Sequence, residues 1–451
     1  MTRRPSGGTR AGGADGVRYV ADVVVTMDAR ARVLRPGAVE VNGDRISWVG
    51  PASEHGAAER EIVVGGLLMP GLVNAHGHSP MTLFRSAGDG LPLERWLADV
   101  IWPREARLRA DDVAWGMRLG AAELLRNGVT STCELYLHPR AVADAALEAG
   151  IRCIVAPGVF DLAGAGPEGS WRRLLDEAAR LHDELRGHEP VLSVAIGPHA
   201  AYTLPEEGLL AVAKVAAELE ALVHIHVAET RAEGRLVDAR YGCSAPELLA
   251  RTGVLDCRVL AAHCVWLSES DVDLFQRHDV AVAHCPQSNG KLGSGMAPVD
   301  EMLGRGLRVG IGTDGPASND NLDLWEEMRL APLLARARRA DPGALSTLDA
   351  LALATRGGAD ALGVPAGRLA VGALADIIRL DLDDPAFVPA LSDEDLLAHL
   401  VWAASSRLVT DVWVGGRQVV AGRRCLTVDE EAARHEVALR ARRLAGLDTG
   451  P

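Results

Sequence analysis

Histidines and an aspartate stand at the ends of apolar runs in the middle of this 451-residue chain. His76 and His78 are two residues apart, so on a strand both imidazoles point to the same face. His226 ends another run, and Asp314 closes a later one within the sequence GTDG. Three neutral imidazoles and one carboxylate suit a divalent metal ion of borderline softness and leave a position open for water. We therefore predict a metal site, with zinc as the first expectation and iron or manganese as alternatives.

The elements that position these residues follow a regular pattern. Between residues 68 and 365, eight apolar runs of strand type alternate with helical stretches rich in Ala, Leu, Arg and Glu. This pattern predicts an α/β fold, a (β/α)8 barrel of the TIM type, in which the active site lies at the carboxyl ends of the strands. The polar residues at the run ends are His76, His78, His199, His226, Glu229, His263, His284 and Asp314.

Runs with strand character also occur at both ends of the chain, over residues 18–67 and 366–430, and each segment contains a glycine-marked hairpin signal. We predict that the two segments form one discontinuous β-sandwich domain beside the barrel of residues 68–365. Residues 1–17 are expected to be a flexible tail, and residues 431–451 a closing amphipathic helix and tail.

The composition of the chain limits the binding partners and the cellular compartment that we expect. A net charge of −14 argues against a nucleic-acid partner, because neutralising phosphates requires a basic face. No apolar run approaches the roughly 18 residues that a membrane span needs. The seven cysteines are an odd number without a CxxC pair, which suits a reducing compartment. We expect a cytoplasmic protein with no nucleic-acid or membrane partner, and a homo-oligomer stays open.

Five motifs follow one another along the chain: PGLVNAHGH, HIHVAE, AAHC, CPQSNGKLGSG and GTDGPASND. Together they resemble the amidohydrolase superfamily, specifically its triazine-hydrolase and adenosine-type deaminase branch. The similarity covers residues 20–430. The resemblance implies that the metal ligands are His76, His78, His226 and Asp314, and that Glu229 and His263 flank the reacting atom.

Lysine usage bears on the number of metal ions. Members of this superfamily with two metals commonly bridge them through a carboxylated lysine at the end of the fourth strand. Here the fourth run ends in Gly197-Pro198-His199, and the nearest lysine, Lys214, lies within a helical stretch. We therefore expect one metal ion per subunit. His224 shares a strand face with the ligands, but four ligands leave it no vacancy, so a supporting or packing role is expected.

The expected chemistry is hydrolytic deamination. Metal coordination lowers the pKa of a bound water to around 7 in zinc sites. We expect Asp314 to take the proton of that water as its oxygen attacks a ring carbon that bears an amino group. Glu229 would protonate the adjacent ring nitrogen, and His263 would orient the attacking oxygen or stabilise the tetrahedral intermediate. The alternatives are a helix-terminal acid for Glu229 and a buried core histidine for His263; His284 is assigned no role.

The segment after the first histidines resembles the methylthioadenosine/S-adenosylhomocysteine deaminases, with Trp96 and Glu105 at nucleoside-contact positions. An indole can cover a purine face, and a carboxylate can accept both ribose hydroxyls. His199 and Ser318 also match substrate-contact positions. The resemblance implies that the 6-amino group of an adenosine-type nucleoside is hydrolysed to the inosine analogue and ammonia.

One segment departs from the pattern of these deaminases, and it bears on the 5′ substituent of the nucleoside. Members that prefer S-adenosylhomocysteine carry arginines after the third strand, which can grip a carboxylate bidentately. Here Pro157 stands where the first is expected, and Arg172 or Arg173 is the candidate for the second. We expect a weakened preference for S-adenosylhomocysteine, and a preference for adenosine, 5′-deoxyadenosine, methylthioadenosine or another 5′-modified adenosine. Lys291, one of two lysines, is a loop candidate, with chance as the alternative.

Two other functions stay open. The same scaffold could deaminate or hydrolyse a free heterocycle such as a triazine, guanine or a pterin, in which case the ribose would bring no benefit. A catalytically inactive relative that serves in binding or assembly would normally have lost metal ligands, and none is missing here.

Overall fold

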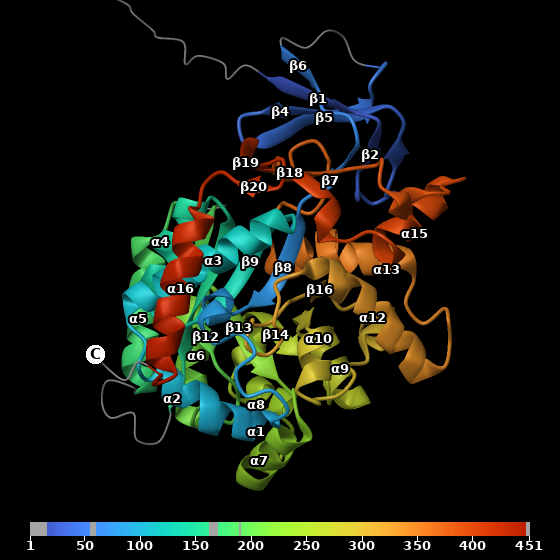
Figure 1. The fold of residues 1–451 in the computed structure, drawn as a ribbon. Coiled ribbons are helices and arrows are strands. Elements are labelled where there is room, and N and C mark those ends of the chain that lie inside the picture. The colour runs from blue at the N-terminus through green and yellow to red at the C-terminus, as the bar shows by residue number, and fades with distance from the viewer. Residues whose placement is uncertain (1–15, 55–59, 162–169, 189–190, 448–451) are drawn as a thin grey trace, which may run out of the picture.

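A computed structural model describes residues 16–54, 60–161, 170–188 and 191–447. Figure 1 shows a group of strands enclosed by helices, with further β-structure at one end that combines the first and the last parts of the chain. Residues 1–15 of the expected tail lie outside the described part, and the first strand already begins at Val17.

Two parallel sheets occupy the middle of the chain. One has the order β11-β10-β9-β8 with β12 paired to β10, and the other the order β13-β14-β15-β16. Isolated parallel bridges join the two sheets at both edges, between Gly77 and Asp314 and between Ile196 and Val223. The strands are β8 (Leu72–Gly77), β9 (Val129–Tyr136), β10 (Arg152–Val159), β11 (Leu192–Val194), β12 (Gly197–Pro198), β13 (Leu222–Val227), β14 (Arg258–His263), β15 (Ala281–His284) and β16 (Val309–Ile311).

Helices follow these strands and cover their outer face, so most strand residues are buried on both faces, as is typical of parallel sheets. The helices of this region are α1 (Leu93–Trp96), α2 (Trp102–Glu105), α3 (Ala110–Arg126), α4 (Pro139–Ala149), α5 (Trp171–Glu184), α6 (Glu206–Leu219), α7 (Arg231–Tyr241), α8 (Ala245–Arg251), α9 (Glu269–Arg277), α10 (Pro286–Lys291), α11 (Val299–Gly304), α12 (Leu324–Arg339), α13 (Thr347–Ala352) and α14 (Gly358–Leu362). In the described ranges no helix has both the length and the apolar character to cross a membrane.

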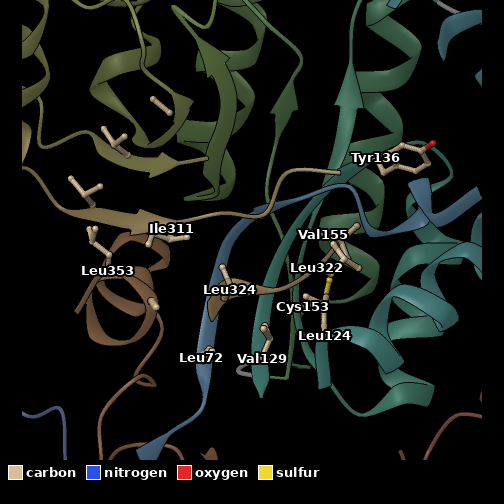
Figure 2. Close-up of a cluster of buried hydrophobic side chains, with 14 of the residues drawn as sticks. Leu72, Leu124, Val129, Tyr136, Cys153, Val155, Ile311, Leu322, Leu324 and Leu353 are labelled. Carbon is tan, nitrogen blue, oxygen red and sulfur yellow. The ribbon is translucent and has the colours of Figure 1, made fainter. Parts of the chain in front are cut away.

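The core lies between the strands and the helices. Figure 2 shows Leu72 of β8, Val129 of β9 and Val155 of β10 near Leu124 of α3. All four are at most 1% exposed. Burying an aliphatic side chain of this size contributes about 1.5–3 kcal/mol. This packing fixes the strands whose carboxyl ends carry the polar residues.

The two terminal segments form two further sheets, with the orders β5-β4-β1-β6 and β20-β19-β18-β17-β7-β2-β3. Their strands are β1 (Val17–Ala21), β2 (Val23–Val25), β3 (Val33–Leu34), β4 (Gly37–Asn42), β5 (Arg45–Pro51), β6 (Arg60–Val63), β7 (Leu67–Pro70), β17 (Ile377–Leu380), β18 (Val409–Val414), β19 (Arg417–Ala421) and β20 (Arg424–Cys425). Figure 1 shows the blue N-terminal strands beside the red C-terminal ones.

The first expected barrel strand is in fact two strands in two sheets. β7 pairs with β2 and β17, whereas β8 pairs with β9, and Gly71 separates them. A Cβ at Gly71 would lie 2.2 Å from the Thr130 Oγ1, so only glycine allows this close crossing. The run that was expected to be the first barrel strand therefore contributes β7 to one sheet and β8 to another. The continuous apolar run concealed the break because both halves are buried.

Two α-helices lie in the described part of the C-terminal region. Helix α16 (Glu430–Leu444) occupies the segment where a closing helix was expected, and it lies along α3 in Figure 1. The Arg443 Nη2 is 2.5 Å from the Asp112 Oδ1 of α3. Helix α15 (Asp393–Trp402) was not predicted, since residues 366–430 were assigned to strands.

Candidate metal centre and substrate cavity

Four of the predicted side chains converge where β8, β13 and β16 end. The Asp314 Oδ1 is 3.1 Å from the His78 Nε2 and 3.3 Å from the His76 Nε2, and the Nε2 atoms of His78 and His226 are 3.3 Å apart. The His76 Nε2 is buried and has no hydrogen-bond partner among the described residues. Oxygen and imidazole donors this close together, one of them unsatisfied, fit a divalent cation.

Hydrogen bonds to backbone carbonyls set the tautomers of these rings. The Nδ1 of His78 donates to the Leu135 carbonyl, and the Nδ1 of His226 donates to the His199 carbonyl at 2.7 Å. A carbonyl can only accept, so each neutral ring keeps its Nε2 lone pair for the centre. Burial lowers the pKa of His226 well below its ordinary value, which keeps that ring neutral.

His224 sets the tautomer of His76 through a two-step relay. Its Nδ1 donates to the Leu260 carbonyl at 3.0 Å, so its Nε2 accepts the Nδ1 proton of His76 at 2.7 Å. Burial lowers the pKa of His224 to about 4 and that of His76 well below its usual range. The relay leaves the His76 Nε2 as a lone-pair donor. This position agrees with the supporting role expected for His224.

Asp314 uses its two oxygens differently. Its Oδ1 faces the imidazoles, whereas its Oδ2 accepts the hydroxyls of Ser288 at 2.6 Å and Ser318 at 2.7 Å. Burial raises the pKa of Asp314, but the neighbouring His76 and His78 outweigh burial and hold that pKa well below its ordinary value. Ser318 was predicted to contact substrate, yet its hydroxyl already donates to this carboxylate.

Glu229 and His263 lie beside this group. The His263 Nε2 is 3.8 Å from the Glu229 Oε2, and the His263 Nδ1 donates to the Asn289 Oδ1 at 2.9 Å. The Ser294 hydroxyl donates to Glu229 at 3.4 Å. Burial raises the pKa of Glu229, so the proton-carrying form persists at higher pH than in an exposed glutamate. Asn289 and Ser294 were missed, although both belong to the motif CPQSNGKLGSG.

Two buried polar links hold the ligand-bearing strand ends. The Asn74 side chain makes two 2.9 Å bonds with Thr313, from its Nδ2 to the hydroxyl and from the Thr313 N–H to its Oδ1. Glu134 accepts the backbone N–H of Ser79 at 2.7 Å and its hydroxyl at 2.6 Å, next to His78. Sequence reasoning missed both, although polar residues inside otherwise apolar strands were a usable signal.

A cavity of about 250 Å³ opens onto the centre. Its walls include Trp96, Glu105, His199 and Ser318, which were predicted as substrate contacts, together with residues that were not predicted. The additional lining residues include Leu93, Leu97, Ile101, Trp102, Tyr136, Phe160, Tyr202 and Glu233. No arginine or lysine among the described residues lines it.

Trp96 and Glu105 come from one helical segment over the cavity. Trp96 is 5% exposed, and its Nε1 donates to the Ala87 carbonyl at 2.8 Å, so its indole is held in one orientation. Burial raises the pKa of Glu105 to about 7, although the Tyr136 hydroxyl and His78 both act to lower it. This segment therefore offers the cavity a fixed aromatic wall and a carboxyl group.

The expectation that Arg172 or Arg173 replaces a substrate-gripping arginine is wrong. Both lie on the exposed side of α5, where they pair with Glu207 at 2.6 Å and Glu177 at 3.2 Å, and neither lines the cavity. The helix turns both guanidinium groups toward its own surface.

The lysines and one histidine also lie outside the cavity lining. Lys291 binds Asp320, and Lys214 is exposed on α6, 3.9 Å from Glu218. The absence of a lysine at the centre, among the described residues, agrees with the argument against a carboxylated bridge. His284 is buried at the end of β15, and neither of its ring nitrogens has a partner in the described part of the chain.

Comparison with known proteins identifies relatives over nearly the whole chain. The amidohydrolase family profile matches residues 67–419. A 5-methylthioadenosine/S-adenosylhomocysteine deaminase of Pelotomaculum thermopropionicum is 42% identical over 431 residues, which cover 94% of this chain and 98% of that protein. A 5′-deoxyadenosine deaminase of Methanothermobacter thermautotrophicus is 42% identical over 386 residues, with 85% and 89% covered. The solved structure of an adenosine deaminase from Xanthomonas campestris with bound zinc has a TM-score of 0.90 at 35% identity, with 95% and 98% covered.

Proposed function

The chain belongs to the amidohydrolase family, and from this premise we propose that it is a hydrolytic deaminase of adenosine-type nucleosides. It acts on a C–N bond of a cyclic amidine and converts the 6-amino group to a carbonyl with release of ammonia. The observation that carries this proposal is the buried Glu229 carboxyl group beside the cluster of His76, His78, His226 and Asp314. Both lie at a cavity whose walls include Trp96 and Glu105. Relatives named as deaminases of such nucleosides support it.

The finer architecture is proposed on the same premise. The two parallel sheets form one closed (β/α)8 barrel, supported by the bridges at both of their edges. The two terminal sheets form the β-sandwich domain, with β7 as part of it. A cytoplasmic location stays a prediction, supported by seven cysteines that form no disulfide.

We propose that His76, His78, His226 and Asp314 hold one divalent ion, zinc in the first place. The fit rests on the lone pairs that the hydrogen bonds leave on the three Nε2 atoms and on the unsatisfied, buried His76 Nε2. The zinc bound in the Xanthomonas campestris structure supports the choice of metal. When bound, such an ion makes a water molecule acidic at neutral pH.

The carboxyl groups then move the protons of the reaction. Asp314 takes one proton from the attacking water, whose oxygen adds to C6, while Glu229 gives its proton to the adjacent ring nitrogen. Asp314 passes its proton to the amino group, the C6–N bond breaks, and ammonia leaves with the electron pair. The hydroxyl proton left on C6 returns to Glu229, so both carboxyl groups end as they began. His263, with its Nδ1 held by Asn289, presents Nε2 to the attacking oxygen.

The cavity also supports a preference at the 5′ position. Its lining contains carboxyl groups and apolar side chains but no described cation, and the segment 162–169, with the sequence LAGAGPEG, contains neither lysine nor arginine. A carboxylate on the 5′ substituent would therefore meet no arginine or lysine among the described lining residues. Adenosine, 5′-deoxyadenosine and methylthioadenosine are the proposed substrates, and S-adenosylhomocysteine a poorer one.

The test is ammonia release from a panel of adenosine, 5′-deoxyadenosine, methylthioadenosine, S-adenosylhomocysteine, adenine, guanine, a pterin and a triazine. The proposal expects kcat/KM values for the uncharged 5′ substituents that exceed that for S-adenosylhomocysteine, and no turnover of free bases. A free base that rivals the nucleosides would refute the nucleoside assignment. S-adenosylhomocysteine as the best substrate would refute the 5′ preference alone.

A further inference from the structure

Glu233 is a buried carboxyl group that the proposed reaction does not use. It lies in the first turn of α7, is 4% exposed and contributes to the cavity wall. Its Oε1 accepts the backbone N–H of Ala228 at 2.9 Å, and its Oε2 accepts that of Glu229 at 2.8 Å. Both of its oxygens are thus bound to the loop that carries the proposed proton donor.

These bonds differ from ordinary helix capping. In the capping box of α8, Glu247 reaches back to the N–H of the N-cap residue, Ser244, at 2.8 Å. In α7 the N-cap is Thr230, whose hydroxyl accepts the N–H of Glu233 at 3.1 Å. The Glu233 carboxylate instead accepts the N–H groups of Glu229 and Ala228, which lie one and two residues before that N-cap. A need to satisfy the helix terminus does not account for these contacts.

The clamped backbone is in an unfavourable conformation. Ala228 has φ of +52°, in the left-handed region, where a non-glycine residue stores about 1–3 kcal/mol. The Ala228 carbonyl is bound from the other side by the N–H groups of Val265 at 3.1 Å and Trp266 at 2.9 Å. Among the described residues, the polar contacts of the Glu229 carboxylate are only long ones, 3.4 Å to the Ser294 hydroxyl and 3.8 Å to the His263 Nε2. The direction of its carboxyl group therefore depends on the backbone.

We propose that Glu233 is a positioning residue, whose two bonds to consecutive N–H groups hold the Ala228–Glu229 backbone so that the Glu229 carboxyl meets the substrate ring. This inference rests on the proposed deamination, in which Glu229 is the proton donor. Glu233 acts through Glu229 and takes no part in proton transfer.

The test uses Glu233→Gln, which keeps the size of the side chain but replaces one acceptor oxygen by an NH2 group. A displacement of about 1 Å at a catalytic group can cost on the order of 100-fold in rate. We expect kcat for adenosine to fall by about 10- to 100-fold with KM changed by less than about threefold. Glu247→Gln removes the same kind of bond from the exposed start of α8 and should leave both constants near those of the wild type.

A double variant separates positioning from direct catalysis. If Glu233 acts through Glu229, the double variant Glu229→Gln/Glu233→Gln has the same kcat as Glu229→Gln alone. In the single variant Glu233→Gln, we also expect faster amide hydrogen exchange in the peptide of residues 222–233. A wild-type kcat in Glu233→Gln, or losses that multiply in the double variant, would overturn the inference. If the wild-type protein released no ammonia from any nucleoside, the proposed function would fail. Unchanged amide hydrogen exchange in Glu233→Gln would separately refute the role of Glu233 in holding the Ala228–Glu229 backbone.

Discussion

The Ser318 hydroxyl donates to the Asp314 Oδ2 at 2.7 Å, on the oxygen opposite the one that approaches His76 and His78. A hydrogen bond to a charged group contributes about 1.5–3 kcal/mol. We expect Ser318→Ala to lower kcat for adenosine by about tenfold or more, with a smaller change in KM. Ser86→Ala removes an exposed serine–aspartate bond and serves as the control. An increase in KM alone would instead indicate that Ser318 contacts the ribose.

The pH dependence of turnover should report Glu229. Because burial raises its pKa, the proton-donating form survives to higher pH and is lost as the pH rises through that raised value. We therefore expect kcat/KM to fall on the alkaline side. Glu229→Gln should lose about 10²- to 10⁴-fold in kcat, and its residual rate should lack this alkaline fall. The measurement is the pH–rate profile of the wild type and of Glu229→Gln. An identical alkaline limb in the variant would exclude Glu229 as the proton donor.

Ribose recognition is tested at Glu105. Glu105→Gln should raise KM for adenosine by about tenfold and leave KM for 2′,3′-dideoxyadenosine nearly unchanged. With a pKa raised to about 7, the accepting carboxylate is present above that pH, so the KM of the wild type for adenosine should rise as the pH falls below it. Asp99→Asn, an exposed carboxylate in the same segment, is the matched control. Equal effects on both nucleosides would contradict the ribose contact.

The hydrogen bond between His76 and His224 should increase the affinity of the site for its metal ion. Removing a hydrogen-bonding partner of a ligating imidazole typically costs about 10- to 100-fold in metal affinity. We expect this loss for zinc in His224→Ala, measured by competition with a chromophoric chelator, and none in His278→Ala, whose ring pairs with Asp256 at a distance from the site. The wild type should bind one ion per chain and lose ammonia release on chelation. A second ion bound with equal affinity would refute the one-metal prediction.

A buried ion pair links β10 to the segment just before β17. The Arg152 Nε is 2.7 Å from the Asp376 Oδ2, the Arg152 Nη2 is 3.0 Å from the Oδ1, and both side chains are at most 4% exposed. Breaking such a pair leaves an uncompensated buried charge and costs about 3–5 kcal/mol. We expect a clearly lower thermal midpoint for Arg152→Ala than for Arg172→Ala, whose pair with Glu207 is exposed and contributes at most about 1 kcal/mol. Equal midpoints would contradict this.

What the sequence by itself determined is the set of chemical groups at the strand ends. A period of two along a strand predicted that His76 and His78 approach one centre, and their Nε2 atoms do lie 3.3 and 3.1 Å from the Asp314 Oδ1, although His78 follows the last residue of β8. Each of the eight apolar runs contains a strand of the two parallel sheets, so local periodicity sufficed to place the strands. Only the tertiary structure decided the rest, because the decisive contacts join residues far apart in the chain. The break at Gly71 depends on Thr130, and the His76 tautomer on the Leu260 carbonyl. The arginines of α5 were misplaced because sequence distance does not reveal the direction in which a helix turns its side chains.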